Sequence, residues 1–132
     1  MILLDTHVWL WWQLGYGPLS AREHAALGDS AARGEVLIAA ISLWEAQVLH
    51  TKGRLALDRP FEMWLRQAAS ADVVQVAALD VDVVVALDRL PKSFHGDPAD
   101  RIIAATAKAH GYRLATHDRA MRRSRAVTLW RP

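Results

Sequence analysis

The fold is decided by a short apolar run that leads directly into an acid and a helix: Ile2-Leu3-Leu4-Asp5-Thr6-His7-Val8-Trp9-Leu10. Residues 2–4 have the composition of a buried strand, and a helical pattern follows over residues 7–14, closed by Gly15 and Gly17-Pro18. The same alternation recurs along the chain. Short apolar runs that each precede a longer helical pattern are typical of an α/β fold with a mainly parallel sheet.

Four further strands and five further helices are expected from the same patterns. The predicted strands cover residues 36–39, 73–77, 112–115 and 126–130. The predicted helices cover residues 20–33, 42–51, 61–70, 80–90 and 98–110, with Gly28 weakening the first of these. The sequence therefore predicts a central, mainly parallel sheet of about five strands flanked by helices, in one domain spanning residues 1–132.

Composition excludes several classes of protein. At 132 residues, 52% hydrophobic and 23% charged, the chain has the make-up of a globular domain. The absence of cysteine excludes disulfides, thiolate zinc sites and a cysteine nucleophile. The N-terminus lacks the basic segment of a signal peptide, and no apolar run approaches the roughly 18 residues that cross a bilayer. We expect a soluble, cytoplasmic protein without a membrane segment.

Three of the predicted strands end close to an acidic residue. Asp5 follows the first strand directly, Glu45 lies a helical turn beyond the second, and Asp118 follows the fourth. A further pair, Asp97 and Asp100, opens the helix that leads into the fourth strand. Because ligands of open α/β sheets bind beyond the carboxyl ends of the strands, these acids are the candidate functional residues.

Each acid also has a structural explanation. Ser42 and Glu45 have the Ser-x-x-Glu spacing of a capping box. Asp97, placed before a proline, is a good helix N-cap, and Asp118 could cap a short last helix. Taken singly, each acid is better explained by such capping. Only their joint occurrence at one edge of the sheet indicates a site.

Carboxylates gathered at one sheet edge repel one another, which disfavours their ionisation. Helix N-termini offset part of this cost, and a divalent cation offsets more. Oxygen ligands suit Mg²⁺ or Mn²⁺, and such a site can assist the displacement of a phosphoryl group. The pattern of acids therefore favours metal-dependent phosphoryl chemistry.

Four segments in order carry a resemblance to a known family. They are Asp5-Thr6-His7-Val8-Trp9-Leu10-Trp11-Trp12, Ser42-Leu43-Trp44-Glu45, Gly96-Asp97-Pro98-Ala99-Asp100-Arg101-Ile102-Ile103-Ala104-Ala105-Thr106-Ala107 and Thr116-His117-Asp118. Together they resemble the PIN-domain nucleases, and among these the VapC-like toxins of bacterial and archaeal toxin–antitoxin systems. The third segment is the most specific, and the resemblance extends from Met1 to Trp130.

The resemblance implies a metal-dependent endoribonuclease with four acidic residues at its centre. Asp5 and Asp100 match the positions of the main Mg²⁺ ligands, with Mn²⁺ as an alternative ion. Asp118 would hold the same or a second metal, and Glu45 would bind metal or orient the attacking water. Asp97, one turn from Asp100, could compete with it as a ligand and ranks below it because it has the better N-cap case.

The resemblance also implies products, partners and one bracing residue. Hydrolysis would leave a 3′-hydroxyl and a 5′-phosphate on the RNA. The cognate VapB-like antitoxin would cover the acidic site with its C-terminal segment, and the toxin would form a homodimer. Thr116 matches a family hydroxyl that braces the site by hydrogen bonding.

Charge is unevenly distributed along the chain. Residues 1–101 carry 9 basic and 13 acidic side chains, whereas residues 102–132 carry 7 basic and 1 acidic. Arg119, Arg122, Arg123 and Arg125 follow Asp118 closely. Such a run of arginines is either a solvated surface or a contact for the RNA backbone. Because it lies beside the acids, we consider the two interpretations equally favoured.

Other chemistry-bearing residues have structural interpretations. His7, His95 and His117 neighbour the proposed site, but a structural or solvent-facing role is favoured over proton transfer. Arg101 is expected to pair with a site carboxylate. Most of the six tryptophans are expected to fill the core, with some lining a groove for a partner helix.

Two other functions remain open at this point. A different Mg²⁺-dependent phosphohydrolase, such as a phosphatase, often has a second Asp two residues after the first, where this chain has His7. A non-catalytic PIN-like module that binds RNA or protein would be expected to have lost some of the acids, which are all present.

Overall fold

The computed structural model describes all residues from Met1 to Pro132 and contains a parallel sheet with the strand order β3-β2-β1-β4. The strands are β1 (Ile2–Leu4), β2 (Val36–Ala39), β3 (Gln75–Ala77) and β4 (Arg113–Ala115). The helices are α1 (Thr6–Leu14), α2 (Ala21–Ala32), α3 (Ala40–Thr51), α4 (Phe61–Ala68), α5 (Val81–Asp88), α6 (Pro98–His110) and α7 (Arg119–Arg123). The predicted α/β class with a parallel sheet is confirmed.

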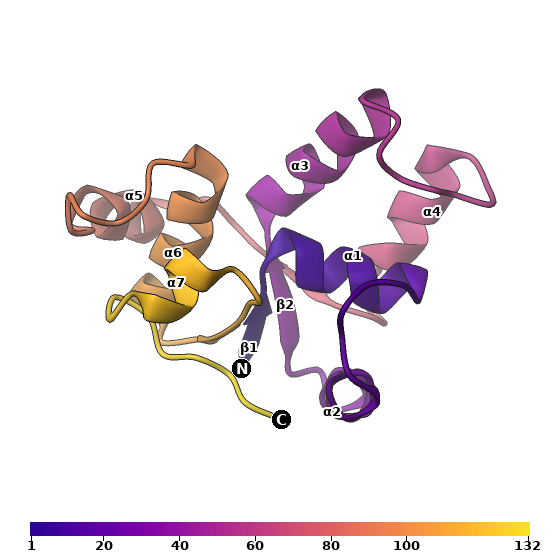
Figure 1. The fold of residues 1–132 in the computed structure, drawn as a ribbon, viewed down its shortest axis with the longest axis horizontal. Coiled ribbons are helices and arrows are strands. Elements are labelled where there is room, and N and C mark those ends of the chain that lie inside the picture. Colours follow the sequence, from indigo (N-terminus) through magenta and orange to yellow (C-terminus); the bar gives the residue numbers. More distant parts are fainter.

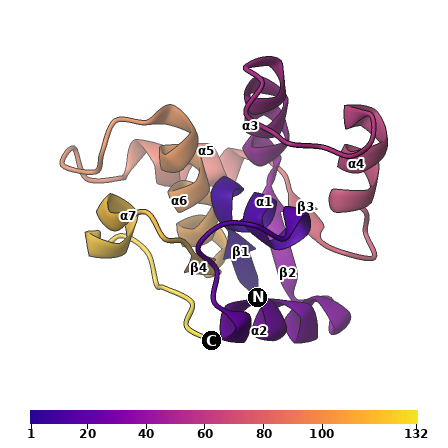
Figure 2. The ribbon, with the colours of Figure 1, turned by 45° about the vertical axis from the view of Figure 1, so that its right-hand side comes forward.

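Helices cover both faces of the sheet (Figure 1). Ile2 and Leu4 of β1 belong to a core cluster with residues of α1, α2 and α4, whereas Leu3 belongs to a second cluster with residues of α5, α6 and α7. Because successive strand residues point to opposite faces, a strand buried on both sides must be apolar throughout. This explains why β1 and β2 read as unbroken apolar runs. Figure 2 shows α5, α6 and α7 on one side of the sheet and α4 on the other.

The tryptophans divide between core and surface. Trp9 is fully buried, packs against the buried Trp64 with ring centroids 5.7 Å apart, and donates its indole N–H to the carbonyl of Ala68 (3.0 Å). Trp130 is also buried. Trp44, in contrast, is 58% exposed. Trp11 and Trp12 are partly buried and pack against the same core cluster. The expected core role therefore holds for most of the tryptophans, and Trp44 needs another explanation.

Two predicted strands differ from the structure by more than one residue. The fifth strand, expected over residues 126–130, is reduced to one isolated bridge between Leu129 and Leu114, because this segment reaches the sheet only at that point. The third strand, expected over residues 73–77, begins at Gln75. The helix over Ala21–Ala32 is continuous despite Gly28, because Ser20 and Glu23 form a capping box that stabilises its start.

The predicted capping box at Ser42 and Glu45 is wrong. Strand β2 runs directly into α3, whose N-cap is Ala39 and whose first turn begins before Ser42, so no side-chain cap is made there. Ser42 is instead fully buried. Glu45 therefore does not serve as a capping-box residue, which was its structural explanation.

No helix of the structure combines the length and the apolarity needed to cross a bilayer.

Candidate metal centre

Asp5 lies at the carboxyl end of β1 and is 5% exposed. It caps α1, since its Oδ1 accepts a hydrogen bond from the Val8 N–H (2.8 Å). Its Oδ2 accepts from the Thr116 hydroxyl (2.5 Å), which is possible because β1 and β4 are neighbours with Leu4 paired to Ala115. Burial raises the pKa of the Asp5 carboxyl, and these two hydrogen bonds offset that rise only in part.

Glu45 reaches the same edge from α3. Its Oε1 accepts a hydrogen bond from the Thr6 hydroxyl, which also lies 2.9 Å from the hydroxyl of Ser42. Burial raises the pKa of Glu45, the Thr6 hydrogen bond acts against this, and the nearby charge of Asp97 raises the pKa further. Glu45 is therefore a half-buried carboxylate that is positioned by hydroxyl groups and has no cationic partner.

Asp97 and Asp100 stand one turn apart at the start of α6. The Oδ1 of Asp97 accepts from the Asp100 N–H (2.9 Å), so the predicted N-cap role of Asp97 is confirmed. The carboxylate of Asp100, in contrast, accepts no hydrogen bond. Burial, followed by repulsion from Asp97, raises the pKa of Asp100 to about 6, although His95 acts to lower it.

Asp118 caps α7 through a hydrogen bond from the Met121 N–H to its Oδ1 (2.9 Å). Its own N–H donates to the Thr116 hydroxyl (3.0 Å), so this one hydroxyl connects Asp118 with Asp5. Thr116 is 3% exposed. The expectation that Thr116 braces the acids therefore has a geometric counterpart.

His95 lies closer to the acids than its predicted structural role suggested. Its Nε2 is 3.4 Å from Asp100 Oδ2 and 4.0 Å from Asp118 Oδ1. The nitrogen is buried but has no hydrogen-bond partner, since neither contact has hydrogen-bond geometry. One ligand atom from each of His95, Asp100 and Asp118 lies within 4.8 Å of the others, which is the arrangement of groups that can hold a metal ion.

The acids act on one another as a single electrostatic unit. The charge of Asp118 raises the pKa of both Asp5 and Asp100, and the charge of Asp5 raises that of Glu45. No arginine or lysine forms a salt bridge with any of them. Buried carboxylates without cationic partners are costly, and a bound cation is the usual compensation. The donor set, which is rich in carboxylate oxygen, fits a divalent metal ion.

The structure thus places all five predicted acids at the carboxyl edge of the sheet, although the tightest group of ligand atoms contains Asp100 and Asp118 rather than Asp5. The sequence interpretation missed the roles of Thr6, whose hydroxyl donates to Glu45, and of Ser42, whose hydroxyl contacts that of Thr6. Their position was the available signal, since Thr6 follows Asp5 directly and Ser42 stands one turn before Glu45.

The prediction that Arg101 pairs with a site carboxylate is wrong. Its guanidinium donates to the carbonyl of Phe94 (3.1 Å) and lies 5.9 Å from the centre of the Phe94 ring. Phe94 also stacks on His95, with ring centroids 5.0 Å apart. Arg101 therefore supports the loop that carries His95 and does not neutralise the acids.

Comparison with known proteins agrees with this architecture. The family model of the PIN domain matches residues 2–126. Ribonuclease VapC22 of Mycobacterium tuberculosis (strain ATCC 25618 / H37Rv) is 39% identical over 132 residues, which cover 98% of this chain and 98% of that protein.

Two solved structures share the fold. A chain in the crystal structure of VapBC2 from Rickettsia felis, bound to a DNA fragment from its promoter, has a TM-score of 0.72 at 16% identity and covers 98% of each chain. A chain in the crystal structure of FitAcB from Neisseria gonorrhoeae has a TM-score of 0.66 at 22% identity and covers 99% of this chain and 97% of that one. At these identities the two structures establish similarity of fold.

Proposed function

Since this chain belongs to the PIN-domain family, we propose that it is a metal-dependent endoribonuclease and the toxin of a toxin–antitoxin pair. The observation that carries this proposal is the meeting of Asp5, Glu45, Asp100 and Asp118, without an arginine or lysine partner, at the carboxyl edge of the sheet. The ribonuclease name of a relative that matches over the whole chain supports RNA as the substrate. The proposal takes residues 1–132 as one domain that acts in the cytoplasm.

Mg²⁺ is the proposed metal, with Mn²⁺ as the alternative, because the available donors are mainly carboxylate oxygens. Asp5, Asp100 and Asp118 would hold it together with Glu45, and Asp97 is a weaker alternative because its Oδ1 is engaged in the helix cap. When bound, such a cation neutralises charge on a phosphodiester and favours the deprotonation of water.

The protein side chains supply orientation and charge. The hydroxyl of Thr116 fixes the rotamer of Asp5, and the hydroxyl of Thr6 fixes that of Glu45, so that neither carboxylate has to reorganise during the reaction. The raised pKa of Glu45 makes this group a better proton acceptor than an ordinary carboxylate. We assign it the role of orienting the attacking water and taking up its proton.

Incubation of purified protein with single-stranded RNA tests this function. We expect cleavage with Mg²⁺ and none with EDTA, and products that carry a 5′-phosphate, which ligation to a 3′-hydroxyl acceptor would detect. RNA binding without any metal-dependent cleavage would support the non-catalytic alternative. Release of inorganic phosphate from small phosphomonoesters, with RNA left intact, would support a phosphatase.

Replacement of Thr116 by valine should lower kcat about 10- to 100-fold, because Asp5 loses the hydroxyl that orients it and that offsets its raised pKa. The alkaline shift of the rising limb of the pH–kcat profile is the specific readout, since the pKa of Asp5 rises further in the variant. The Thr116→Ser variant keeps a hydroxyl and should recover most of the activity. Equal losses in the serine and valine variants would indicate a packing role instead.

An exposed apolar surface next to the acids supports an antitoxin as the partner. Trp44 on α3 is 58% exposed and lines a cavity of about 330 Å³ together with Glu45 and Asp97. A second cavity of about 430 Å³, lined by Leu43 and Leu65, lies between α3 and α4. An apolar helix of a VapB-like antitoxin that occupied this surface would also lie over the acidic site.

Replacement of Trp44 by alanine should weaken antitoxin binding by about 2 kcal/mol or more, as expected of an exposed tryptophan at the centre of an interface. Calorimetry with the cognate antitoxin that this proposal requires would measure the change, and the thermal unfolding of the free protein should hardly change. Met63 on α4 is similarly exposed (55%) but lines neither of these two cavities. The Met63→Ala variant is therefore the control and should bind the antitoxin nearly as well as the wild type. Unchanged affinity in the Trp44 variant would remove this surface from the interface.

We also propose a homodimer, as the family resemblance implies. Val81, Val84 and Val85 leave α5 with an exposed apolar face, and the neighbouring Leu79 is 50% exposed. A surface of this kind suits a two-fold symmetric contact between identical chains. Sedimentation velocity of the wild type and of a Val81→Asp, Val84→Asp variant checks this, and a wild type that is monomeric at micromolar concentration would contradict it.

A further inference from the structure

Helix α7 separates two basic cavities, and this arrangement was not evident from the sequence. Arg122 and Arg123 are neighbours in the chain, yet Arg122 lines a cavity of about 590 Å³ and Arg123 lines a different cavity of about 600 Å³. The arginines after Asp118 therefore do not form one patch but contribute to two.

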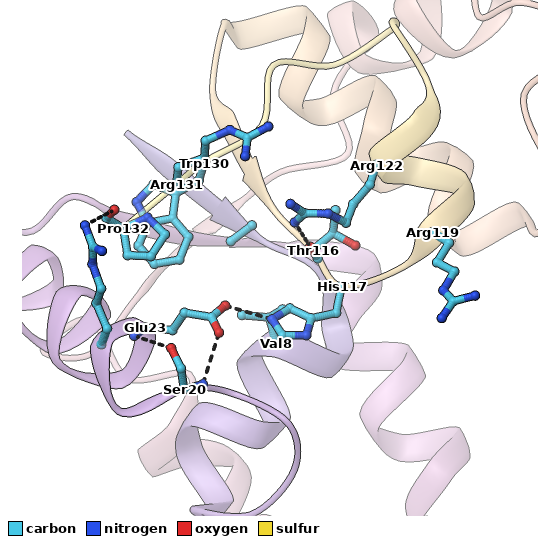
Figure 3. Close-up of a pocket in the computed structure, with 12 residues that line it drawn as sticks. Val8, Ser20, Glu23, Thr116, His117, Arg119, Arg122, Trp130, Arg131 and Pro132 are labelled. Atoms are coloured by element: carbon cyan, nitrogen blue, oxygen red, sulfur yellow. Dashed lines mark hydrogen bonds and ion pairs between the residues drawn. The ribbon is translucent and has the colours of Figure 1, made fainter.

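The first cavity lies between α2, the segment after β4 and the C-terminal residues (Figure 3). Its walls are held by cross-connections, since His117 contacts Glu23 at 2.7 Å and Arg22 donates to the carbonyl of Pro132 (3.1 Å). Glu23 is its one carboxylate side chain. The arginines that line the cavity are Arg22, Arg119, Arg122 and Arg131.

The second cavity lies on the other side of α7, against α6 and the loop before it. It is lined by Lys108, Arg123 and Arg125, together with His95 and other residues that include no carboxylate. Both cavities touch the acidic site, the first through Thr116 and the second through His95, whose Nε2 is 3.4 Å from Asp100.

The cations of both cavities are free of protein carboxylates. None of the arginines and lysine that line them forms a salt bridge with a carboxylate side chain. Two of their guanidinium groups donate to backbone oxygens, Arg122 to Thr116 (2.9 Å) and Arg22 to Pro132 (3.1 Å). Unpaired guanidinium groups are suited to bind phosphate oxygens. An acidic peptide would also be attracted, but a chain of regularly spaced phosphates better fits two basic cavities that lie on either side of α7 and each border the acidic site.

We propose that these cavities are two backbone-binding subsites for one RNA strand, one on each side of the phosphodiester at the acidic site. The inference rests on the proposed nuclease function and adds to it. An RNA strand held on both sides is cut in its interior, and each subsite binds the strand on one side of the cut. Neither cavity is expected to select a base, because its cations contact phosphates.

The test is RNA binding in EDTA, where the wild-type protein leaves the probe intact. Two double variants remove one pair of cations each: Arg119→Ala with Arg131→Ala for the first cavity, and Arg123→Ala with Arg125→Ala for the second. Arg122 is kept because it also contacts the backbone. The control is Arg89→Ala with Arg113→Ala, which removes the same charge from exposed positions outside both cavities.

On a fluorescein-labelled 24-nucleotide RNA of mixed sequence, each double variant should bind about tenfold more weakly at low salt. It should also lose about 1.4 from the slope of log affinity against log salt, which is the loss for two single-strand phosphate contacts. The quadruple variant should show the sum of both losses, and the control less than a twofold change. On a trinucleotide, each double variant should lose less than about twofold, because the intact cavity still holds the short RNA.

Three results would overturn the proposal: losses equal to those of the control, a loss from one cavity only, or full losses on the trinucleotide. Tighter binding of polyglutamate than of RNA would favour a protein partner and would also contradict it. Failure of the nuclease function is distinguishable. Additive binding losses without Mg²⁺-dependent cleavage would contradict the nuclease function but support the two subsites. Mg²⁺-dependent cleavage with unchanged RNA binding in both double variants would support the nuclease function but contradict the two subsites.

Discussion

The Asp100→Asn variant should lose RNA cleavage by about 10³-fold or more in kcat/KM while its metal-free fold becomes more stable. Asp100 is partly buried, repelled by Asp97, Glu45 and Asp118, and its pKa is raised to about 6. Removal of this charge relieves a cost on the order of 2 kcal/mol near pH 7.5. A gain in stability together with a loss of activity is typical of a residue retained for function.

The matched control is Asp97→Asn, one helical turn away. Asparagine caps a helix about as well as aspartate, so this variant should keep the fold and lose activity about threefold at most. Initial rates of RNA cleavage and urea unfolding in EDTA are the two measurements. A larger loss in the Asp97 variant than in the Asp100 variant would reverse the ligand assignment, and a destabilised Asp100→Asn protein would contradict the electrostatic argument.

In EDTA, the free energy of unfolding should fall as the pH rises from about 4 to about 7. Burial raises the pKa values of Asp5, Glu45 and Asp100, so in this range the native state retains protons that the unfolded chain has released. Stability decreases with pH wherever the native state binds more protons. For Asp100, the contribution is present below the ordinary aspartate pKa of 3.8 and is lost as the pH passes its raised pKa of about 6.

Saturating Mg²⁺ should weaken or reverse this trend, since the cation binds the ionised carboxylates and its stabilisation grows with pH. Urea unfolding at pH values of about 5 and 7.5, with Mg²⁺ or with EDTA, measures both effects. The Asp100→Asn variant should show a flatter pH dependence in EDTA. A stability that rises over this range in EDTA, or that responds equally to Mg²⁺ at both pH values, would contradict the account.

Local patterns predicted much of the fold because strand burial and helix capping leave direct marks in the sequence. The apolar run before Asp5 and the N-cap positions of Asp97 and Asp118 were readable in this way. Tertiary contacts decided the rest. Ser42 has the spacing of a capping residue but lies inside α3, because β2 joins that helix without a turn.

The candidate site was predicted as a set of acids but not as a geometry. Topology brings the ends of β1 and β4 side by side, and this places Thr116 between Asp5 and Asp118. The contact of His95 with Asp100 depends on the packing of Phe94 under Arg101, which no spacing reveals. Arg122 and Arg123 line different cavities because both lie on the short helix α7, where consecutive side chains point in different directions.

A double-mutant cycle between Asp5 and Asp100 tests most directly whether acids from separate segments form one catalytic metal centre. The measured quantity is kcat/KM for Mg²⁺-dependent RNA cleavage by the wild type, Asp5→Asn, Asp100→Asn and the double variant. Groups that act as one unit are strongly non-additive, so the double variant should be about as inactive as either single variant. Losses that multiply, or either single variant retaining wild-type activity, would contradict a shared centre.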